Sequence, residues 1–278
     1  MDKTNFSDEE MKKKLLEMFK WFHAFCKENM IRYYVIDGTM LGAARHQGFI
    51  PWDDDIDIGI PRKDYERLAE LMSKKTDCKY VLETPQSKAS DFIYTYSKLY
   101  DSTTTLIERA KKNIVRGIFL DIFPLDGLGN SIEEAQKRFR KINLYFFLYM
   151  SRVVAVNPER KLYKNIVLKM IQLIPNFILN NKKLQLKIDK MCKTLDYDEC
   201  KICGNLLGTW RFRDVMDKDI MGKPTPYLFE NQEVCGVEDY DRYLTHLYGD
   251  WKQLPPKNQQ ISKHSFEYCN LYESYKAL

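Results

Sequence analysis

The sequence predicts a mixed α/β fold of the α+β class, and three features support this prediction. Residues 7–30 place apolar side chains at helical spacing. A short β-branched and aromatic run ends at Ile36 and leads through a small-residue turn into a second helix. Two apolar runs, residues 55–60 and 117–124, are typical of strands that also carry carboxylates. With 278 residues, 44% of them hydrophobic, the chain can bury a sizeable core.

Residues 7–30 are expected to form an amphipathic helix. Ser7 and Glu10 have the spacing of a capping box, in which each side chain accepts a hydrogen bond from the other residue's backbone N–H. The apolar residues Met11, Leu15, Met18, Phe19, Phe22 and Cys26 follow on one face. We therefore expect this face to cover the core.

The turn Asp37-Gly38-Thr39 follows the first expected strand and opens a helix running toward Ala44. A helix N-terminus presents unpaired N–H groups with a partial positive charge, and glycine allows a ligand to approach the backbone closely. Gly38 and Thr39 are therefore candidate phosphate-binding residues. The alternative is an ordinary strand-to-helix connection.

The acidic segment at residues 53–60, DDDIDIGI, alternates carboxylate and isoleucine. In a strand, Asp55 and Asp57 share one face while the isoleucines occupy the other, buried face. Side chains two apart on one face stand about 7 Å from each other, close enough to hold one divalent cation or a pair. Such oxygen ligands suit magnesium, with manganese as the alternative. A solvated acidic loop is the competing interpretation, whereas an EF-hand is excluded by its missing glycine and closing glutamate.

A third carboxylate, Asp121, interrupts the apolar run at residues 117–124. Burying an isolated ionised aspartate is costly unless it meets a cation or several donors. Beside Asp55 and Asp57 it would complete a two-metal site for an in-line phosphoryl displacement. Alternatively, Asp121 ends the strand and caps a turn at residues 124–127.

Two cations are candidate substrate contacts. Lys98 lies in the expected strand at residues 92–100, where it would neutralise a diphosphate as the leaving group departs, unless it is an ordinary solvated lysine. Arg45 stands near the end of the helix that follows the turn. A cation there either contacts substrate or complements the helix dipole.

Three regions are expected: a catalytic core at residues 1–129, a helical region at 130–200 and a mixed segment at 201–278 that completes the active-site cleft. Ser131 and Glu134 predict one helix start, and Asn157-Pro158 predicts the next. Residues 161–179 form a basic amphipathic segment, which either lies on an anionic membrane surface or packs against the domain. His264 is either an acceptor-site base or a residue of an exposed tail.

Composition excludes several classes of protein. The net charge of +5 suits an anionic substrate or an acidic membrane face, but it lacks the concentrated basic footprint of a nucleic-acid binder. Seven singly scattered cysteines indicate a reducing compartment, and Cys200 and Cys203 lack the second ligand pair of a zinc site, so buried thiols are expected. No apolar signal segment and no apolar run of about 20 residues is present, so we expect a cytoplasmic protein, with association at the inner membrane face as an option.

Residues 37–46 and 48–57 resemble the signature of the LicD family, within the nucleotidyltransferase-fold superfamily, and the resemblance continues through Lys98, residues 119–127 and residues 240–256. It implies a nucleotidyltransferase-like core with a small mixed sheet flanked by helices, a helical insertion and a mixed C-terminal segment. By motif, Asp55 and Asp57 match the metal-binding pair, Asp121 the third carboxylate, and Gly38 and Thr39 the phosphate-binding elbow.

The resemblance further implies transfer of a phosphoalcohol from a CDP-alcohol, typically CDP-choline, with CMP leaving. The acceptor would be a hydroxyl of a cell-surface glycan or its lipid-linked precursor, as in teichoic acid or lipopolysaccharide. We expect a metal-assisted in-line attack in which Asp121 also accepts the hydroxyl proton. A nucleotidyltransferase that releases pyrophosphate and a catalytically silent nucleotide-binding protein are the alternatives. The sequence leaves open whether the alcohol is choline, ethanolamine, ribitol or glycerol.

Overall fold

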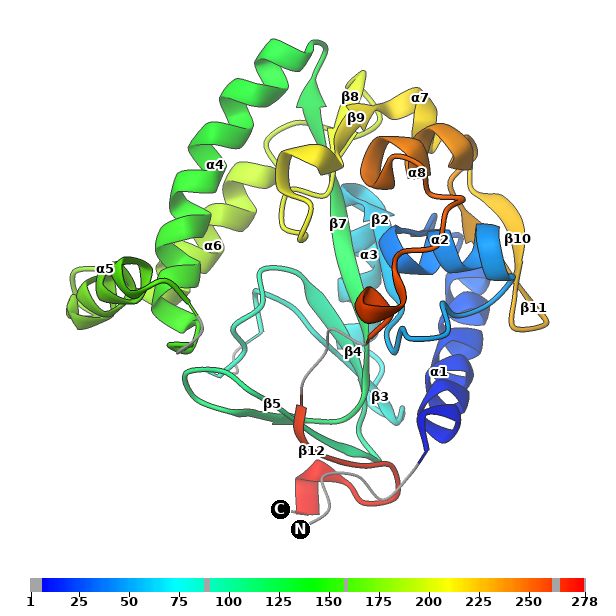
Figure 1. The fold of residues 1–278 in the computed structure, drawn as a ribbon, viewed down its shortest axis with the longest axis horizontal. Coiled ribbons are helices and arrows are strands. Elements are labelled where there is room, and N and C mark those ends of the chain that lie inside the picture. The colour runs from blue at the N-terminus through cyan, green and yellow to red at the C-terminus, as the bar shows by residue number, and fades with distance from the viewer. Residues whose placement is uncertain (1–6, 88–90, 158–159, 262–265, 278) are drawn as a thin grey trace.

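The structure is a computed structural model that describes residues 7–87, 91–157, 160–261 and 266–277. Pro158 and His264 lie outside these ranges. The helices are α1 Asp8–Glu28, α2 Asp37–His46, α3 Arg62–Ser73, α4 Ile132–Val153, α5 Leu162–Leu173, α6 Asn181–Cys192, α7 Lys218–Met221 and α8 Tyr240–Tyr248 (Figure 1). The α+β class predicted from the sequence is confirmed.

A mixed nine-stranded sheet forms the centre of the molecule, in the order β10-β11-β1-β2-β7-β4-β3, with β8 and β9 attached to the far half of β7. Its strands are β1 Tyr34–Val35, β2 Asp57–Pro61, β3 Tyr80–Glu83, β4 Ser97–Asp101, β7 Phe119–Gly129, β8 Ile202–Gly204, β9 Val215–Asp217, β10 Thr225–Phe229 and β11 Gln232–Gly236. A second sheet, β12-β5-β6, contains β5 Thr105–Glu108, β6 Ile114–Arg116 and β12 Phe266–Asn270. The central sheet is larger than the small core sheet expected, because the segment after residue 200 adds four strands to it.

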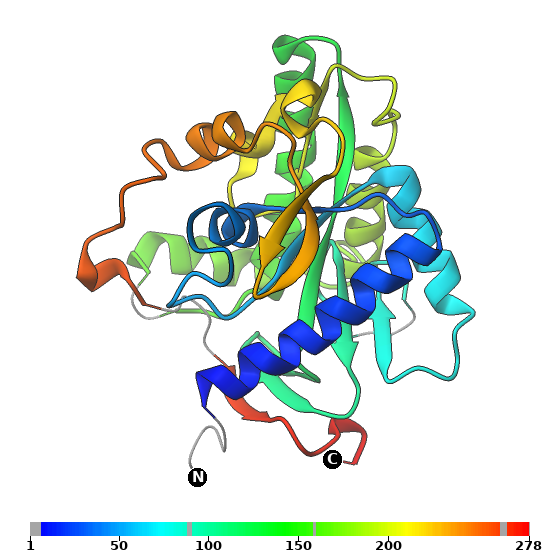
Figure 2. The same ribbon diagram turned by 90° about the vertical axis from the view of Figure 1, so that its right-hand side faces the viewer.

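Helix α1 forms as predicted and crosses one face of the sheet over β7 (Figure 2). Ser7 and Glu10 make the capping box, with the Glu10 N–H donating to Ser7 Oγ (3.2 Å) and the Ser7 N–H donating to Glu10 Oε2 (2.8 Å). Every residue of the expected apolar face is buried. Local sequence signals therefore determine both the start of this helix and the face that it buries.

Strand β7 is longer than the predicted run and passes through Pro124 to Gly129. This excludes the alternative in which residues 124–127 form a turn. Proline is rare inside sheets because it lacks an N–H. Pro124 is tolerated because it falls between Ile122, the last residue paired with β4, and Asp126, the first paired with β8, so that β7 has a neighbour on only one side there.

Three other expected elements differ from the sequence prediction. The strand expected at residues 92–100 begins only at Ser97, and β2 begins at Asp57 rather than Asp55. Helix α5 begins at Leu162, after its N-cap Lys161, and not at Asn157-Pro158. In each case the local pattern indicated the right type of element, but the pairing and packing partners determined where it starts.

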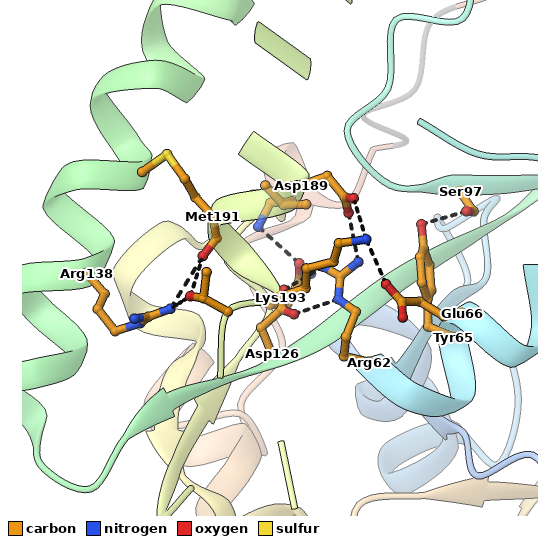
Figure 3. A network of polar contacts seen from close by, with 12 residues as sticks. Arg62, Tyr65, Glu66, Ser97, Asp126, Arg138, Asp189, Met191 and Lys193 are labelled. Atoms are coloured by element: carbon orange, nitrogen blue, oxygen red, sulfur yellow. Dashed lines mark hydrogen bonds and ion pairs between the residues drawn. The ribbon is translucent and has the colours of Figure 1, made fainter. Parts of the chain in front are cut away.

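The helical region packs on a second hydrophobic cluster, formed mainly by α4 and α6, and a buried ionic network joins it to the core (Figure 3). Arg62 of α3 donates from Nε and Nη2 to the two carboxylate oxygens of Asp126 in β7 (2.7 and 2.8 Å) and from Nη1 to Asp189 of α6 (2.8 Å). Gln86 donates to the other oxygen of Asp189 (2.6 Å). One guanidinium thus connects three elements that the sequence placed in two regions.

All seven cysteines are free thiols, and Cys200 and Cys203 are buried as expected. Burial raises the pKa of the Cys203 thiol to about 12. Across the described ranges, no helix is both long enough and apolar enough to cross a bilayer.

Candidate active site

The parallel pairing of β2 with β7 brings two of the predicted acids together. Asp57, the first residue of β2, lies opposite Asp121 of β7, and Ile58 lies opposite Ile122. Strands in a sheet are about 4.8 Å apart, and side chains at paired positions point to the same face. The two carboxylates therefore stand side by side, while the isoleucines face the core and are fully buried.

Asp55 precedes β2 and completes the acidic trio of Asp55, Asp57 and Asp121. Carboxylate oxygens of the three residues lie within 4.8 Å of one another. The Asp121 N–H donates to the carbonyl of Ile56 (3.1 Å), which holds the segment before β2 against β7. The structure thus brings together all three carboxylates that the sequence singled out.

The electrostatics of the acidic trio suit a cation. Two unit charges about 5 Å apart repel by roughly 3 kcal/mol at an effective dielectric constant of about 20. Burial raises the pKa of Asp57 well above its ordinary value, and the charges of Asp55, Asp37 and Asp121 raise it further. The three carboxylates repel one another when ionised. A hard divalent ion bound between their oxygens would offset this repulsion.

Gly38 and Thr39, predicted to bind phosphate, both contact the acidic segment. Thr39 is buried, and its Oγ1 accepts a hydrogen bond from the Asp57 N–H (2.8 Å). A Cβ on Gly38 would lie 2.7 Å from Asp53 Oδ2, so a larger residue there would require the Asp53 carboxylate to shift. The turn therefore positions the start of β2, and neither residue lies on the cavity wall described below.

Lys98 lies beside Asp121 rather than on the cavity wall. It is 2% exposed, and its Nζ lies 3.1 Å from Asp121 Oδ1 and 3.3 Å from Glu108 Oε1. The pairing of β4 with β7 puts Lys98 directly opposite Asp121. Its charge therefore compensates the acidic trio, and its burial excludes the alternative of an ordinary solvated lysine. The expected diphosphate contact stays a prediction.

Arg45 is likewise directed at protein groups. Its Nη1 donates to the carbonyl of Trp251 (2.9 Å), and its Nε donates to His46 Nε2 (3.0 Å). It stands in the last turn of α2, where a cation complements the helix dipole. This position fits the role expected at the helix end, and the expected substrate contact of Arg45 stays a prediction.

A cavity of about 390 Å³ opens over the acidic trio. Its wall is made of acidic, aromatic and small residues from several parts of the chain. The lining residues are Asp37, Asp55, Asp57, Ile93, Tyr94, Thr95, Tyr96, Asp121, Phe123, Phe146, Met150, Leu207, Gly208, Thr209 and Arg211. The cavity is large enough for a small ligand.

Several known proteins share sequence with this chain. The family described as "LicD/FKTN/FKRP, nucleotidyltransferase domain" matches residues 30–146, which include the acidic trio. The lipopolysaccharide cholinephosphotransferase LicD of Haemophilus influenzae is 29% identical over 255 residues, covering 90% of this chain and 92% of that protein. The chain belongs to the LicD family.

Other relatives share shorter stretches with this LicD-family chain. The ribitol 5-phosphate transferase FKRP of Homo sapiens is 46% identical over 41 residues, which are 15% of this chain and 8% of that protein. An uncharacterised Rickettsia prowazekii protein, RP689, is 32% identical over 126 residues, 42% of this chain and 38% of its own. Likeness over nearly the full length is thus found with the cholinephosphotransferase.

Two charged residues of the cavity wall, Asp37 and Arg211, were not predicted from the sequence. Asp37 begins α2 with a positive φ of 49°; its N–H donates to Tyr243 Oη (3.1 Å), which in turn donates to Asp37 Oδ1 (3.3 Å). Burial raises the pKa of Asp37 to about 7. The position of Asp37 at the strand-to-helix turn was the sequence feature that could have predicted its place in the site.

Arg211 is the one basic residue among the described residues that line the cavity. It lies outside the matched LicD-family range, its φ is +63°, and its guanidinium stands 4.2 Å from the ring centre of Phe146. Its Nη2 also donates to Asn143 Oδ1. Nothing in the local sequence distinguishes it from the other arginines, because its position depends on how the C-terminal segment packs against α4.

The raised pKa of Asp57 predicts how stability depends on pH without metal. The ordinary pKa of this carboxyl is 3.8, and its pKa in the folded protein is higher. The folded state therefore becomes less stable relative to the unfolded state as the pH rises above 3.8, because ionisation is harder in the folded protein. We therefore expect metal-free Asp57→Asn to have a higher melting temperature than wild type at neutral pH. The increase should be about 2–4 °C for each kcal/mol of free energy of unfolding that the substitution adds. The difference should shrink toward pH 4.

Thermal unfolding with and without Mg²⁺ checks this expectation. Magnesium should raise the melting temperature of wild type more than that of Asp57→Asn, because it binds the folded state. Asp54→Asn, a neighbouring acid outside the trio, is the matched control and should behave as wild type. Identical pH profiles for wild type and Asp57→Asn would contradict the assigned electrostatics.

Proposed function

We propose that this chain is a metal-dependent phosphotransferase that moves a phosphoalcohol, most favourably phosphocholine, from a CDP-alcohol to a hydroxyl of a cell-surface glycan or its lipid-linked precursor and releases CMP. The observation that carries the proposal is the convergence of three carboxylates within 4.8 Å beside a cavity of ligand size. Membership of the LicD family and similarity to a lipopolysaccharide cholinephosphotransferase support phosphoalcohol transfer.

The residues present fit a magnesium or manganese site. Asp55, Asp57 and Asp121 would hold the ion, which when bound would offset the negative charge of the diphosphate and of the departing cytidylate. Thr39 fixes Asp57 through its backbone, and Lys98 compensates Asp121 (3.1 Å), so both ligands are held in position by neighbours. Arg211 is placed to contact an anionic group in the cavity.

The acceptor hydroxyl must lose a proton as it attacks phosphorus. Asp121 borders the cavity and stays the first candidate for this role. Asp37 is a second candidate on the same wall, since burial raises its pKa to about 7, close to the operating pH at which a general base is most efficient.

The aromatic wall of the cavity favours a cationic alcohol at Tyr96 and Phe123, because the rings of Tyr94 and Phe146 already face Lys98 (4.2 Å) and Arg211 (4.2 Å). The rings of Tyr96 and Phe123 lie 4.2 Å apart, and those of Tyr94 and Tyr96 lie 5.6 Å apart. Aromatic faces attract quaternary ammonium groups through the ring quadrupole. Choline fits this wall better than ribitol or glycerol, whose hydroxyls require hydrogen-bond partners instead.

The deciding experiment is a screen of CDP-choline, CDP-ethanolamine, CDP-ribitol and CDP-glycerol with Mg²⁺, scored by CMP release in the presence of glycan acceptors. We expect CMP and a phosphodiester product, with CDP-choline the best donor. Pyrophosphate released from a nucleoside triphosphate would instead indicate the nucleotidyltransferase alternative. A silent binding protein would release neither product; if no thermal shift with CDP-choline and Mg²⁺ were seen either, nucleotide binding would also be excluded.

The aromatic wall makes a separate prediction about donor choice. Tyr96→Leu should lower kcat/KM for CDP-choline by about 2- to 30-fold, the range of a cation–π contribution, and lower that for CDP-glycerol much less. Tyr96→Phe, which keeps the ring, should retain the preference. An equal loss with both donors would assign Tyr96 a structural role only.

A further inference from the structure

Helix α5 exposes an apolar face that no part of the described chain covers. Leu162 is 77% exposed and Leu173 is 80% exposed, and in the turn that follows Phe177 is 87% exposed. The exposed apolar residues are Leu162, Tyr163, Ile166, Val167, Met170, Leu173, Phe177 and Ile178, here termed the α5 face. In Figure 1, α5 lies at the outer edge of the molecule, on the side of α4 away from the sheet.

The side of α5 opposite this face holds the helix to the protein. At 100° per residue, buried Asn165 and Leu168 lie opposite the centre of the α5 face. Gln172 Nε2 donates to the carbonyls of Ser151 (3.0 Å) and Val154 (2.9 Å) at the end of α4. A surface helix normally turns its apolar stripe inward, and this one does the reverse.

Arg152 fixes the end of α5. Its Nη1 donates to the carbonyls of Ile171 (3.1 Å) and Ile174 (2.6 Å), and its Nε donates to Asn181 Oδ1 (2.6 Å). These bonds satisfy the carbonyls that a helix C-terminus leaves open. The outward orientation of the α5 face is therefore held by defined polar contacts.

The charged residues in the segment that contains the α5 face are all basic. Residues 160–188 contain seven basic residues, Arg160, Lys161, Lys164, Lys169, Lys182, Lys183 and Lys187, and no aspartate or glutamate. By helical geometry Lys164 and Lys169 flank the two sides of the α5 face, and both are exposed. Lysines at such borders extend their amines toward the polar boundary while their stems lie along apolar surface.

We propose that the α5 face docks on the surface of an anionic lipid bilayer, with the helix lying in the plane of the interface. An apolar stripe bordered by lysines complements both the acyl boundary and the negative headgroups. A second copy of the chain fits less well, because face-to-face packing would bring two sets of these basic residues together. The inference does not depend on the proposed reaction.

Docking at α5 would place the cavity near the bilayer. Helix α4, to which α5 is fixed, also supplies Phe146 and Met150 to the cavity wall. If the acceptor is carried by a membrane lipid, the same helix would connect the bilayer-contacting face to the reaction site.

Vesicle flotation tests the proposal, with vesicles of phosphatidylcholine alone and of phosphatidylcholine mixed with phosphatidylglycerol. We expect the full chain to float with the anionic vesicles, to float less at high salt, and to stay in solution with the neutral ones. The triple substitution Leu162→Gln, Met170→Gln and Leu173→Gln should abolish flotation, since glutamine keeps helix propensity but removes the apolar face. Met30→Gln with Leu254→Gln, at exposed apolar sites elsewhere, is the matched control and should float as wild type.

Two further measurements test whether the α5 face binds a lipid bilayer or a second copy of the chain. Lys164→Gln with Lys169→Gln should weaken anionic binding while leaving the melting temperature unchanged, and this pair decides the matter if the triple variant fails to fold. Wild type that does not float, or a triple variant that floats as wild type does, would overturn the proposal. So would a dimer in analytical ultracentrifugation that the triple substitution dissociates, because the α5 face would then be covered by a second copy.

Discussion

Replacing Asp55 or Asp57 by alanine should abolish phosphoalcohol transfer while leaving the chain folded. The two carboxylates and that of Asp121 supply the oxygens that would hold the metal, and they lie within 4.8 Å of one another. Removing one leaves too few ligands to offset the charge of the diphosphate. We expect CMP release to fall by about 10²- to 10³-fold or more, because that is the scale of the loss when one preorganised electrostatic group is removed.

The fold should survive these substitutions, because the trio is a source of repulsion and not of packing. Burial and neighbouring charges already oppose ionisation of Asp57, so its loss relieves a cost. Asp54→Ala is the matched control, a neighbouring acid in the same segment but outside the trio, and should keep near-normal activity. CMP release at near wild-type rate by Asp55→Ala or Asp57→Ala, with Mg²⁺ present, would rule out the proposed mechanism.

Replacing Arg62 by methionine should produce the largest loss of stability. The Arg62 side chain is 6% exposed, and its partners Asp126 and Asp189 are 0% and 5% exposed. Removing one member of a buried ion pair costs about 3–5 kcal/mol in free energy of unfolding, because the remaining charge keeps its desolvation penalty. Urea unfolding measures this loss, and the midpoint concentration should fall in proportion.

The pH dependence of the Arg62→Met defect follows from Asp126. Burial raises the pKa of this carboxyl and the Arg62 charge lowers it, so removing the guanidinium raises it further. When the pKa of Asp126 is raised in the folded variant, the variant loses stability as the pH rises. The stability loss caused by Arg62→Met should therefore be largest at neutral pH and smaller in acid. Adding Asp126→Asn and Asp189→Asn should recover much of the loss.

Lys63→Met provides the control on the same helix. Lys63 pairs with Asp196 (2.5 Å), but its side chain is 68% exposed, and an exposed pair contributes little to stability because water screens it. Equal stability of Arg62→Met and Lys63→Met at neutral pH would contradict the inference that the ionic network in Figure 3 holds α6 to the core.

The candidate site was predictable from the sequence where chemistry and local pattern coincide. Asp55 and Asp57 alternate with buried isoleucines, and Asp121 interrupts an apolar run, so their burial required a compensating partner whatever the fold. The roles of Gly38, Thr39 and Lys98 were not predictable in the same way. Each contacts a residue at least 15 positions away, such as Asp53 for Gly38, and no short window contains that information.

The sequence by itself determined the local features of this protein: the capped α1 helix, the strand-to-helix turn at Asp37 and the type of each acid-bearing strand. These depend on residues within one or two turns of each other, where hydrogen bonding and side-chain periodicity act directly. The tertiary structure alone decided that β2 pairs in parallel with β7, which sets Asp57 opposite Asp121. It also decided that Arg211 lines the cavity and that α5 turns its apolar face outward, since long-range packing fixes which neighbour each side chain meets.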